Sequence, residues 1–198
     1  MNRPDAATRQ ARAEELVERL AGKPIVLVGM MGVGKTTIGR RVAAKLSRQF
    51  LDSDEEIEKA AQMSIPDMFE QRGEAEFRAG ETRVIARVLK DRDIVLATGG
   101  GAFVNAETRA LVKGEAVSVW LKANADILFE RVSRRSNRPL LKTANPRATL
   151  ERLIEERYPI YAEADLTVLS RDVPQDVVAN DVIDAVLGFL KRRNSDHG

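Results

Sequence analysis

The sequence predicts an α/β fold of three layers, with helices on both faces of a five-stranded parallel sheet. Two observations predict this fold. Short apolar segments rich in Val, Ile and Leu recur along the chain, and stretches with apolar residues at helical spacing lie between them. The chain has 198 residues, which is enough for one domain with its own hydrophobic core.

The predicted strands are short and do not alternate apolar with polar residues. This is typical of strands that helices cover on both faces. The predicted strands are Ile25–Val28, a short strand that ends near Asp52, Ile94–Ala97, residues 116–121 and Leu166–Leu169.

The predicted helices show apolar residues three or four positions apart and begin at residues that favour helix starts. Helical spacing is clearest in two groups: Phe77, Val84, Ile85, Val88 and Leu89, and Val178, Val182, Ala185, Val186, Phe189 and Leu190. Helix starts are expected at Ser64, which Pro66 follows, and at Asn105 and Asn124.

The chain contains no internal linker, so we expect a single domain at residues 23–190. A helical extension at residues 1–22, with Leu16, Val17 and Leu20 on one face, precedes this domain. A polar tail follows at residues 191–198. The lone histidine, His197, belongs to this tail, so we do not expect it to act as a base.

The composition argues against several classes of protein. Hydrophobic residues make up 43% of the chain, and no apolar run approaches the roughly 20 residues of a membrane span. The 32 basic residues are nearly balanced by 30 acidic ones, which gives no electrostatic case for a nucleic-acid partner. The first residues lack a secretory signal and the chain has no cysteine. We expect a cytoplasmic protein, which we take to be a monomer.

A phosphate-binding motif follows the first predicted strand. The segment Gly29-Met30-Met31-Gly32-Val33-Gly34-Lys35-Thr36 matches G-x-x-x-x-G-K-[ST], and a helical pattern follows it, as this motif requires. Its glycines let N–H groups point at phosphate oxygens, and the helix adds its positive end. Lys35 can reach the β- and γ-phosphates, and the Thr36 hydroxyl can bind Mg²⁺. We therefore expect a site for a nucleoside triphosphate.

Two aspartates, Asp52 and Asp54, flank Ser53 directly after the second predicted strand. On an extended chain, residues two apart point the same way and lie about 6.5–7 Å apart. One carboxylate then suits the hydration shell of Mg²⁺ and the other an acceptor hydroxyl. The alternative is that both aspartates only stabilise the start of the next helix.

Three further features suggest what accepts the phosphoryl group. They are Arg78 beside a buried Phe77 near a helix start at residues 73–78, Gly99, Gly100 and Gly101 after the third strand, and Arg157 with Tyr161 on a late helix. Glycines at the carboxyl end of a parallel strand let backbone amides approach a ligand. Two arginines in the same crevice would bind a carboxylate. The predicted acceptor is a small polyhydroxy acid.

The order and spacing of these motifs resemble the shikimate kinase family. The resemblance spans about residues 24–185 and rests on residues 29–37, Asp52-Ser53-Asp54, residues 73–81, Gly99-Gly100-Gly101-Ala102, Arg138-Pro139-Leu140-Leu141 and residues 157–161. It implies a nucleoside-monophosphate-kinase-like P-loop fold with strand order 2-3-1-4-5. It also implies transfer of the ATP γ-phosphoryl group to the 3-hydroxyl of shikimate, with Mg²⁺ as cofactor.

The resemblance assigns roles to individual residues. Asp54 holds the reacting hydroxyl and is the candidate base, and Lys35 and Arg138 share the charge that develops on the transferred group. Thr36 is expected to bind Mg²⁺ directly, and Asp52 to approach it through water. The acceptor-binding region is expected at about residues 54–82. The acceptor-binding residues are Asp54, Arg78, Gly99, Gly100, Gly101 and Arg157. The nucleotide-binding residues are Gly32, Val33, Gly34, Lys35, Thr36, Thr37, Arg131, Arg138 and Pro174.

A cation-rich segment lies at residues 131–147. A run of charges is usually a solvated surface, and no aromatic residue is interleaved here to stack on nucleic-acid bases. The resemblance makes residues 132–147 a lid that closes over ATP and excludes water.

Two alternatives remain open at this point. One is another kinase of the same fold, acting on gluconate or a nucleoside monophosphate. A nucleobase would favour aromatic or amide side chains on the acceptor side, where we expect Phe69 and Phe77 in the core. The other alternative is a nucleotide-dependent regulatory protein, which would leave the paired arginines unexplained.

Overall fold

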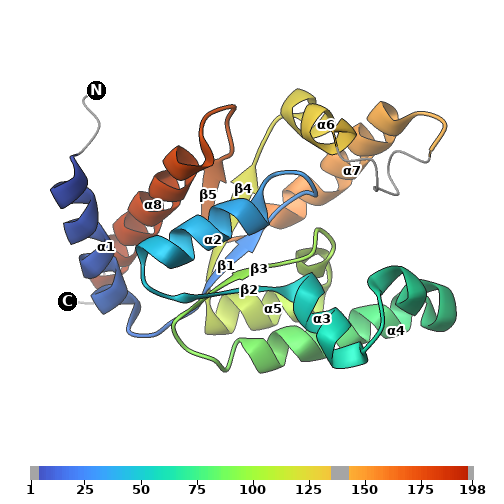
Figure 1. The fold of residues 1–198 in the computed structure, drawn as a ribbon, viewed down its shortest axis with the longest axis horizontal. Helices are drawn as coiled ribbons and strands as arrows, with labels where there is room; N and C mark the ends of the chain where they lie inside the picture. The colour runs from blue at the N-terminus through green and yellow to red at the C-terminus, as the bar shows by residue number, and fades with distance from the viewer. Residues whose placement is uncertain (1–4, 135–142, 196–198) are drawn as a thin grey trace.

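The computed structural model describes residues 5–134 and 143–195 of the chain. Within these ranges, strands and helices alternate along the sequence (Figure 1). In chain order the elements are α1 (Ala6–Leu20), β1 (Ile25–Val28), α2 (Lys35–Lys45), β2 (Gln49–Asp52), α3 (Ser53–Ala61), α4 (Ile65–Val88), β3 (Ile94–Ala97), the 3₁₀ helix η1 (Ala102–Val104), α5 (Ala106–Glu115), β4 (Val117–Lys122), α6 (Ala125–Ser133), α7 (Pro146–Tyr161), β5 (Leu166–Leu169) and α8 (Gln175–Ser195).

The five strands form one parallel sheet in the order β2-β3-β1-β4-β5. This confirms the predicted fold class and the strand order that the family resemblance implied. β1 lies in the centre, where Ile25 pairs with Val95 of β3 and with Val117 of β4. The carboxyl ends of β1 and β3 therefore meet at one edge of the sheet, which is where parallel sheets bind ligands.

Helices cover both faces of the sheet (Figure 1). α2 and α8 pack on each other and on the strands at one face, while α5, with the second half of α4 beside it, covers the other. Every residue of β1 and β3 is buried, as their unbroken apolar runs predict.

The predicted boundaries agree closely with the observed elements. β1, β3 and β5 have the predicted bounds, whereas β4 begins at Val117 rather than at Ala116. The difference arises because the N–H of Ala116 still donates to the carbonyl of Val112 in the last turn of α5. Capping side chains confirm the predicted helix starts at Ser64, Asn105 and Asn124.

α4 is interrupted at Gly73. This residue has φ 77° and ψ 169°, a backbone conformation that L residues rarely adopt. No atom lies within 4 Å of the position that a Cβ would take, so the glycine is required by its conformation and not by lack of space. The helix resumes after the interruption. The helix start predicted near residue 73 is thus the second half of one longer, kinked helix, which carries Arg78 toward the sheet.

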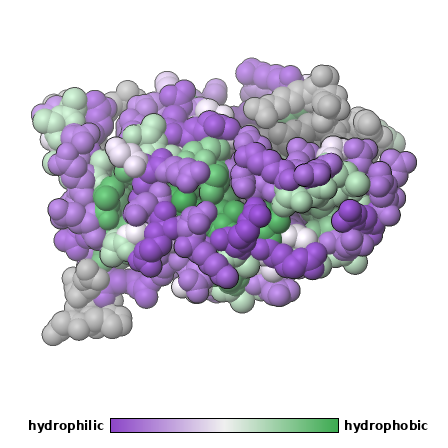
Figure 2. Space-filling model, turned by 60° about the horizontal axis from the view of Figure 1, so that its bottom comes forward, coloured by the Kyte–Doolittle hydropathy of each residue, from purple (hydrophilic) through white to green (hydrophobic). Residues whose placement is uncertain are grey.

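The surface of the described residues is largely polar. On the face shown in Figure 2, hydrophilic side chains predominate and hydrophobic ones show mainly in the hollows between them. Leu169 is the one large hydrophobic side chain of residues 5–134 and 143–195 that is strongly exposed, at 56%. Within the same ranges, the helices lack the length and hydrophobicity that a membrane span needs.

The amino-terminal helix α1 lies alongside α8 (Figure 1). Its apolar face buries Ala13, Leu16 and Leu20 in the main hydrophobic core. Ion pairs reinforce the contact at its edges, including one of 2.9 Å between Arg12 and Asp184 of α8. The helical extension is therefore packed on the body of the protein. The division into residues 1–22, 23–190 and 191–198 stays a prediction.

We predict that Leu16→Ala lowers the free energy of unfolding by about 2–5 kcal/mol, because Leu16 is fully buried and its removal leaves a cavity between α1 and α8. Urea denaturation followed by circular dichroism measures this change. The matched control is Glu18→Ala, an exposed position of the same helix, which should change the stability by less than about 0.5 kcal/mol. Equal denaturation midpoints for the two variants would show that α1 does not contribute to the core.

Candidate active site

The loop between β1 and α2 forms an anion-binding helix start. Gly34 precedes α2 with φ 101°, and the backbone of Gly32 also has a positive φ, of 80°. No described side chain caps α2, so the first N–H groups of this helix can donate to an anion. The predicted residues Gly32, Gly34, Lys35, Thr36 and Thr37 all line a cleft at this point. The side chain of Val33, in contrast, is buried in the core.

Lys35 is held inside this loop. Its Nζ donates to the carbonyl oxygens of Gly29 at 2.7 Å and Met30 at 3.0 Å, and the residue is only 9% exposed. The ammonium group is therefore fixed at the bottom of the cleft, where it can meet a phosphate as a compact charge.

The predicted metal residues contact each other. The Thr36 hydroxyl donates to Oδ2 of Asp52 at 2.8 Å, across the gap between α2 and β2. These hydroxyl and carboxylate oxygens fit the ligand preference of Mg²⁺. Among the described residues, no group of three or more Asp, Glu, His or Cys could hold a metal ion. An ion at Thr36 would thus take its other ligands from phosphates and water, as Mg²⁺ commonly does.

The expected extended geometry of Asp52 and Asp54 is wrong. β2 ends at Asp52, whose side chain caps α3 by accepting the N–H of Asp54 at 3.1 Å, so Asp54 lies in the first helical turn. The chain turns here because this cap satisfies an N–H group at the helix start. Both aspartates nevertheless line the cleft. Asp52 therefore serves the helix start and the site together, so the two interpretations of the sequence do not exclude each other.

Asp54 is in an unfavourable place for a charge. Burial, together with the neighbouring Asp52 carboxylate, raises the pKa of Asp54, while the Lys35 ammonium acts in the opposite direction. A carboxylate of raised pKa is a better proton acceptor than an exposed one. This environment suits a group that holds or deprotonates a hydroxyl.

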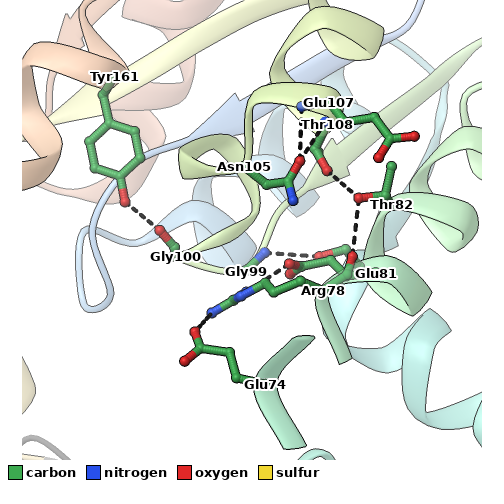
Figure 3. Close-up of polar contacts among 11 residues, drawn as sticks. Glu74, Arg78, Glu81, Thr82, Gly99, Gly100, Asn105, Glu107, Thr108 and Tyr161 are labelled. Atoms are coloured by element: carbon green, nitrogen blue, oxygen red, sulfur yellow. Dashed lines mark hydrogen bonds and ion pairs between the residues drawn. The ribbon is translucent and has the colours of Figure 1, made fainter. Parts of the chain in front are cut away.

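Arg78 lies between two carboxylates of its own helix (Figure 3). Its Nη1 is 2.7 Å from Oε2 of Glu81, which is 1% exposed, and its Nη2 is 3.5 Å from Oε1 of Glu74. Burial raises the pKa of Glu81, and the paired Arg78 guanidinium opposes this shift. Glu81 thus fixes one side of the guanidinium, and the remaining N–H groups of Arg78 can still donate to a ligand.

A hydroxyl pair ties this part of α4 to α5 (Figure 3). The Thr82 hydroxyl lies 3.1 Å from the carbonyl oxygen of Arg78 and 2.8 Å from the hydroxyl of Thr108. Because a carbonyl can only accept, the Thr82 hydroxyl donates its proton to the carbonyl of Arg78. The hydroxyl of Thr108 must then donate to that of Thr82. The backbone of Arg78 is thereby connected to the start of α5.

The three glycines after β3 lie near the charged side chains of Asp54 and Arg78. A Cβ at Gly99 would be 2.6 Å from Oδ1 of Asp54, and one at Gly101 would be 2.5 Å from Nη2 of Arg78. The N–H of Gly99 donates to the Ser53 hydroxyl at 2.8 Å. We call residues 99–101 the glycine loop. A side chain at Gly99 would displace Asp54 and one at Gly101 would displace Arg78, because these two charged groups approach the backbone closely.

Arg157 reaches the same loop from α7. Its Nη1 lies 4.0 Å from the position that a Cβ of Gly100 would take. One turn later on α7, the hydroxyl of Tyr161 donates to the carbonyl of Gly100 (Figure 3). Arg78 and Arg157 therefore flank neighbouring residues of the glycine loop, as the sequence predicts for a carboxylate site.

The nucleotide side of the cleft is closed by α6 and by the start of α8. Arg131 donates to the carbonyl of Arg171 at 2.8 Å and to the Ser170 hydroxyl at 2.9 Å, so it links α6 to the segment after β5. Among the described residues of this segment, Gln175 rather than its predicted neighbour Pro174 lines the cleft. Arg138, like half of the predicted lid at residues 132–147, lies outside the described residues.

The cleft that joins these parts has a volume of about 440 Å³. It brings together most of the predicted nucleotide and acceptor residues, with Asp54 between them. Its lining residues are Met31, Gly32, Gly34, Lys35, Thr36, Thr37, Asp52, Asp54, Thr98, Gly99, Gly100, Arg131, Arg134 and Gln175. Arg78, Gly101 and Arg157 are not part of this lining, and the two arginines reach the glycine loop beside it.

Several residues of the site escaped the sequence reasoning. Glu81 stands in the segment that resembles the family, and the helical spacing of three residues is the signal that could have predicted its pairing with Arg78. Ser53 was passed over between its acidic neighbours, although its hydroxyl holds Gly99. Gln175, whose buried Oε1 accepts no hydrogen bond from the described residues, carries no sequence signal.

Comparison with known proteins agrees with this geometry. The family model for shikimate kinase matches residues 31–187. The chain is 57% identical to the shikimate kinase of Mesorhizobium japonicum over 86% of its own length and 84% of the relative's. It is 46% identical to that of Brucella canis over 98% of both chains. The solved structure of the Acinetobacter baumannii shikimate kinase in complex with shikimate superimposes with a TM-score of 0.81, at 38% identity over 87% of this chain and 97% of that one.

Residues 31–187, which the family model matches, contain the phosphate loop from Gly32 to Thr37, the paired aspartates, the glycine loop and both arginines, which are features on which the resemblance rested. The chain therefore belongs to the shikimate kinase family of ATP-dependent phosphotransferases.

Proposed function

We propose that this chain transfers the γ-phosphoryl group of ATP to the 3-hydroxyl of shikimate, which yields shikimate 3-phosphate and ADP. The observation that carries the proposal is the arrangement of one cleft. The phosphate loop, Asp54 and the first two residues of the glycine loop line this cleft, and Arg78 and Arg157 reach the glycine loop beside it. Family membership and the shikimate complex of the Acinetobacter baumannii relative support the same substrate.

On the nucleotide side, Gly32, Val33, Gly34, Lys35, Thr36 and Thr37 are proposed to bind the phosphates. Lys35, held at the base of the loop, neutralises charge on the transferred group. Thr36 and, through water, Asp52 are the proposed holders of Mg²⁺. When bound, the ion neutralises phosphate charge.

On the acceptor side, Arg78 and Arg157 are proposed to bind the carboxylate of shikimate, because a guanidinium matches a carboxylate with two parallel hydrogen bonds. Glu81 supports this by holding one edge of the Arg78 guanidinium at 2.7 Å. The backbone of Gly99, Gly100 and Gly101 supplies further contacts. Asp54 orients the 3-hydroxyl and can accept its proton.

Arg131 and Pro174 are proposed for the adenine side, with Arg138 and the lid at residues 132–147 as predicted from the sequence. The lid would exclude water, so that the phosphoryl group passes to shikimate and not to a water molecule. We further propose that the chain is a cytoplasmic monomer.

We predict that shikimate stimulates ADP release from Mg·ATP, whereas gluconate and nucleoside monophosphates do not. Only shikimate combines a carboxylate for the two arginines with a hydroxyl for Asp54 on a compact ring. A coupled assay of ADP release across the three acceptors measures this directly. Stimulation by gluconate or by a nucleoside monophosphate alone would replace the proposed substrate, and no stimulation by any acceptor would favour a regulatory protein.

We predict that Arg78→Ala and Arg157→Ala each raise the KM for shikimate by about 10–100-fold, since a charged hydrogen bond to the carboxylate is lost. The KM for ATP should change by less than about two-fold. Steady-state kinetics with each substrate varied in turn distinguishes the two effects. Arg152→Ala is the matched control, because Arg152 lies on α7 but pairs on the surface with Glu156. A KM for shikimate unchanged in both active-site variants refutes the carboxylate assignment.

We predict that Asp54→Asn lowers kcat by about 10²–10⁴-fold and at the same time raises Tm at neutral pH. The raised pKa means that the ionised carboxylate destabilises the folded chain. This cost is absent below the ordinary pKa of 3.8 and is complete once the pH exceeds the raised pKa, so the gain in Tm should disappear in acid.

Turnover assays measure the effect on kcat. Thermal melts from about pH 3.5, which is just below the ordinary carboxyl pKa, to about pH 8 measure the effect on Tm. Glu55→Gln, which removes an exposed carboxylate of the same turn, should leave kcat unchanged. Near-normal turnover of Asp54→Asn would remove its proposed role.

A further inference from the structure

Tyr161 is a fully buried phenol at the end of α7, with 0% exposure. Its ring lies among other aromatic rings, with centroids 6.1 Å from that of Trp120 and 6.5 Å from that of Tyr158. An apolar residue would fill such a place without needing a hydrogen bond, whereas a buried hydroxyl must find a partner. The choice of partner therefore indicates what the hydroxyl does.

The partner is the glycine loop. The Tyr161 hydroxyl donates to the carbonyl of Gly100 (Figure 3). It also lies 3.9 Å from Sδ of Met30 in the phosphate loop. Burial raises the pKa of Tyr161 to about 12, against the opposing effect of the Arg157 guanidinium. The phenol is therefore protonated, and a donor, at neutral pH.

This bond determines the direction of a backbone donor. The carbonyl of Gly100 and the N–H of Gly101 belong to one planar trans peptide unit, so they point in opposite directions. Fixing the carbonyl toward α7 thus fixes the N–H of Gly101 away from α7. The N–H of Ala102 donates to the carbonyl of Gly99 at 3.2 Å and closes a turn around this peptide unit. Such a turn admits two orientations of its central peptide unit, and the bond from Tyr161 selects one of them.

Two hydrogen bonds from other elements therefore hold the glycine loop, one at Gly99 and one at Gly100. Ser53, beside Asp54, accepts the N–H of Gly99 at 2.8 Å, and Tyr161 donates to Gly100. Tyr161 follows Arg157 by one helical turn, so both side chains project from the same face of α7. One helix thus carries a carboxylate-binding arginine and the hydroxyl that orients the loop next to it.

We propose that Tyr161 is a positioning residue for the acceptor site: through its bond to Gly100 it holds the glycine loop in register with Arg157, and so sets the affinity for shikimate. This inference rests on the proposed function, because it concerns the acceptor of that reaction.

Tyr161→Phe tests the proposal, since it removes the hydroxyl and keeps the ring. We expect the KM for shikimate to rise by about 3–10-fold, as the loss of one neutral hydrogen bond implies, while the KM for ATP changes by less than about two-fold. Tyr158→Phe is a matched control. Tyr158 lies on the same helix and also donates to a backbone carbonyl, that of Ala123, but this contact is away from the glycine loop.

If both variants lower Tm similarly and both leave the KM for shikimate unchanged, Tyr161 is only a structural residue and the proposal is wrong. A rise in KM for Tyr161→Phe alone supports it. Hydrogen–deuterium exchange of the peptide that contains residues 99–101 adds a readout without substrate. Exchange should become faster in Tyr161→Phe and not in Tyr158→Phe, and equal exchange in all three proteins contradicts the loop-holding role. If the wild type shows no shikimate-stimulated ADP release, the proposed function fails, and the exchange experiment still decides whether Tyr161 holds the loop.

Discussion

The pairing of β1 with β3 is the constraint on which the site depends. Residues 25–27 pair with residues 95–97, and beyond the last pair the backbone N–H and the hydroxyl of Thr98 both donate to the carbonyl of Leu27, at 3.1 Å and 3.0 Å. These bonds hold the two strand ends together as the chain leaves the sheet. In the proposed function, the loop after β1 binds the phosphates of ATP and the loop after β3 faces the acceptor. Transfer between two substrates thus becomes possible because two strands distant in sequence are neighbours in the sheet.

The second constraint is electrostatic. Glu81 is buried and Asp54 is partly buried, and burial raises the pKa of each. Lys35 opposes the shift of Asp54 and Arg78 opposes that of Glu81, so each acidic group has one basic neighbour. Such an arrangement stabilises the folded chain less than an apolar core would, because ions lose their hydration when they are buried. It provides charges that are already oriented before a substrate arrives, and oriented charges are the main means by which a phosphotransferase acts.

The glycine loop shows how a segment without side chains is given a fixed shape. Turn bonds to the carbonyls of Gly99 and Gly101 lead the chain into η1, and the neighbouring elements add the contacts that orient the loop. Ser53 of α3 and Tyr161 of α7 each make one hydrogen bond to it, and Arg78 of α4 lies against it. The amino-terminal helix contributes at a greater distance. By packing on α8, it supports the helix whose first residue, Gln175, lines the nucleotide side of the cleft.

The sequence by itself determined the fold class, nearly all strand bounds and the helix starts, because these follow from local hydrophobicity and capping. The motif of the phosphate loop is also local, since one strand, one loop and one helix start form it. Tertiary structure alone decided the position of Asp54, which lies in a helical turn because Asp52 caps α3. It also decided the pairing of Arg78 with Glu81 and the bond from Tyr161 to Gly100, which spans 61 residues. Such contacts join separate elements, and their partners are chosen by how the helices pack on the sheet, which no local pattern specifies.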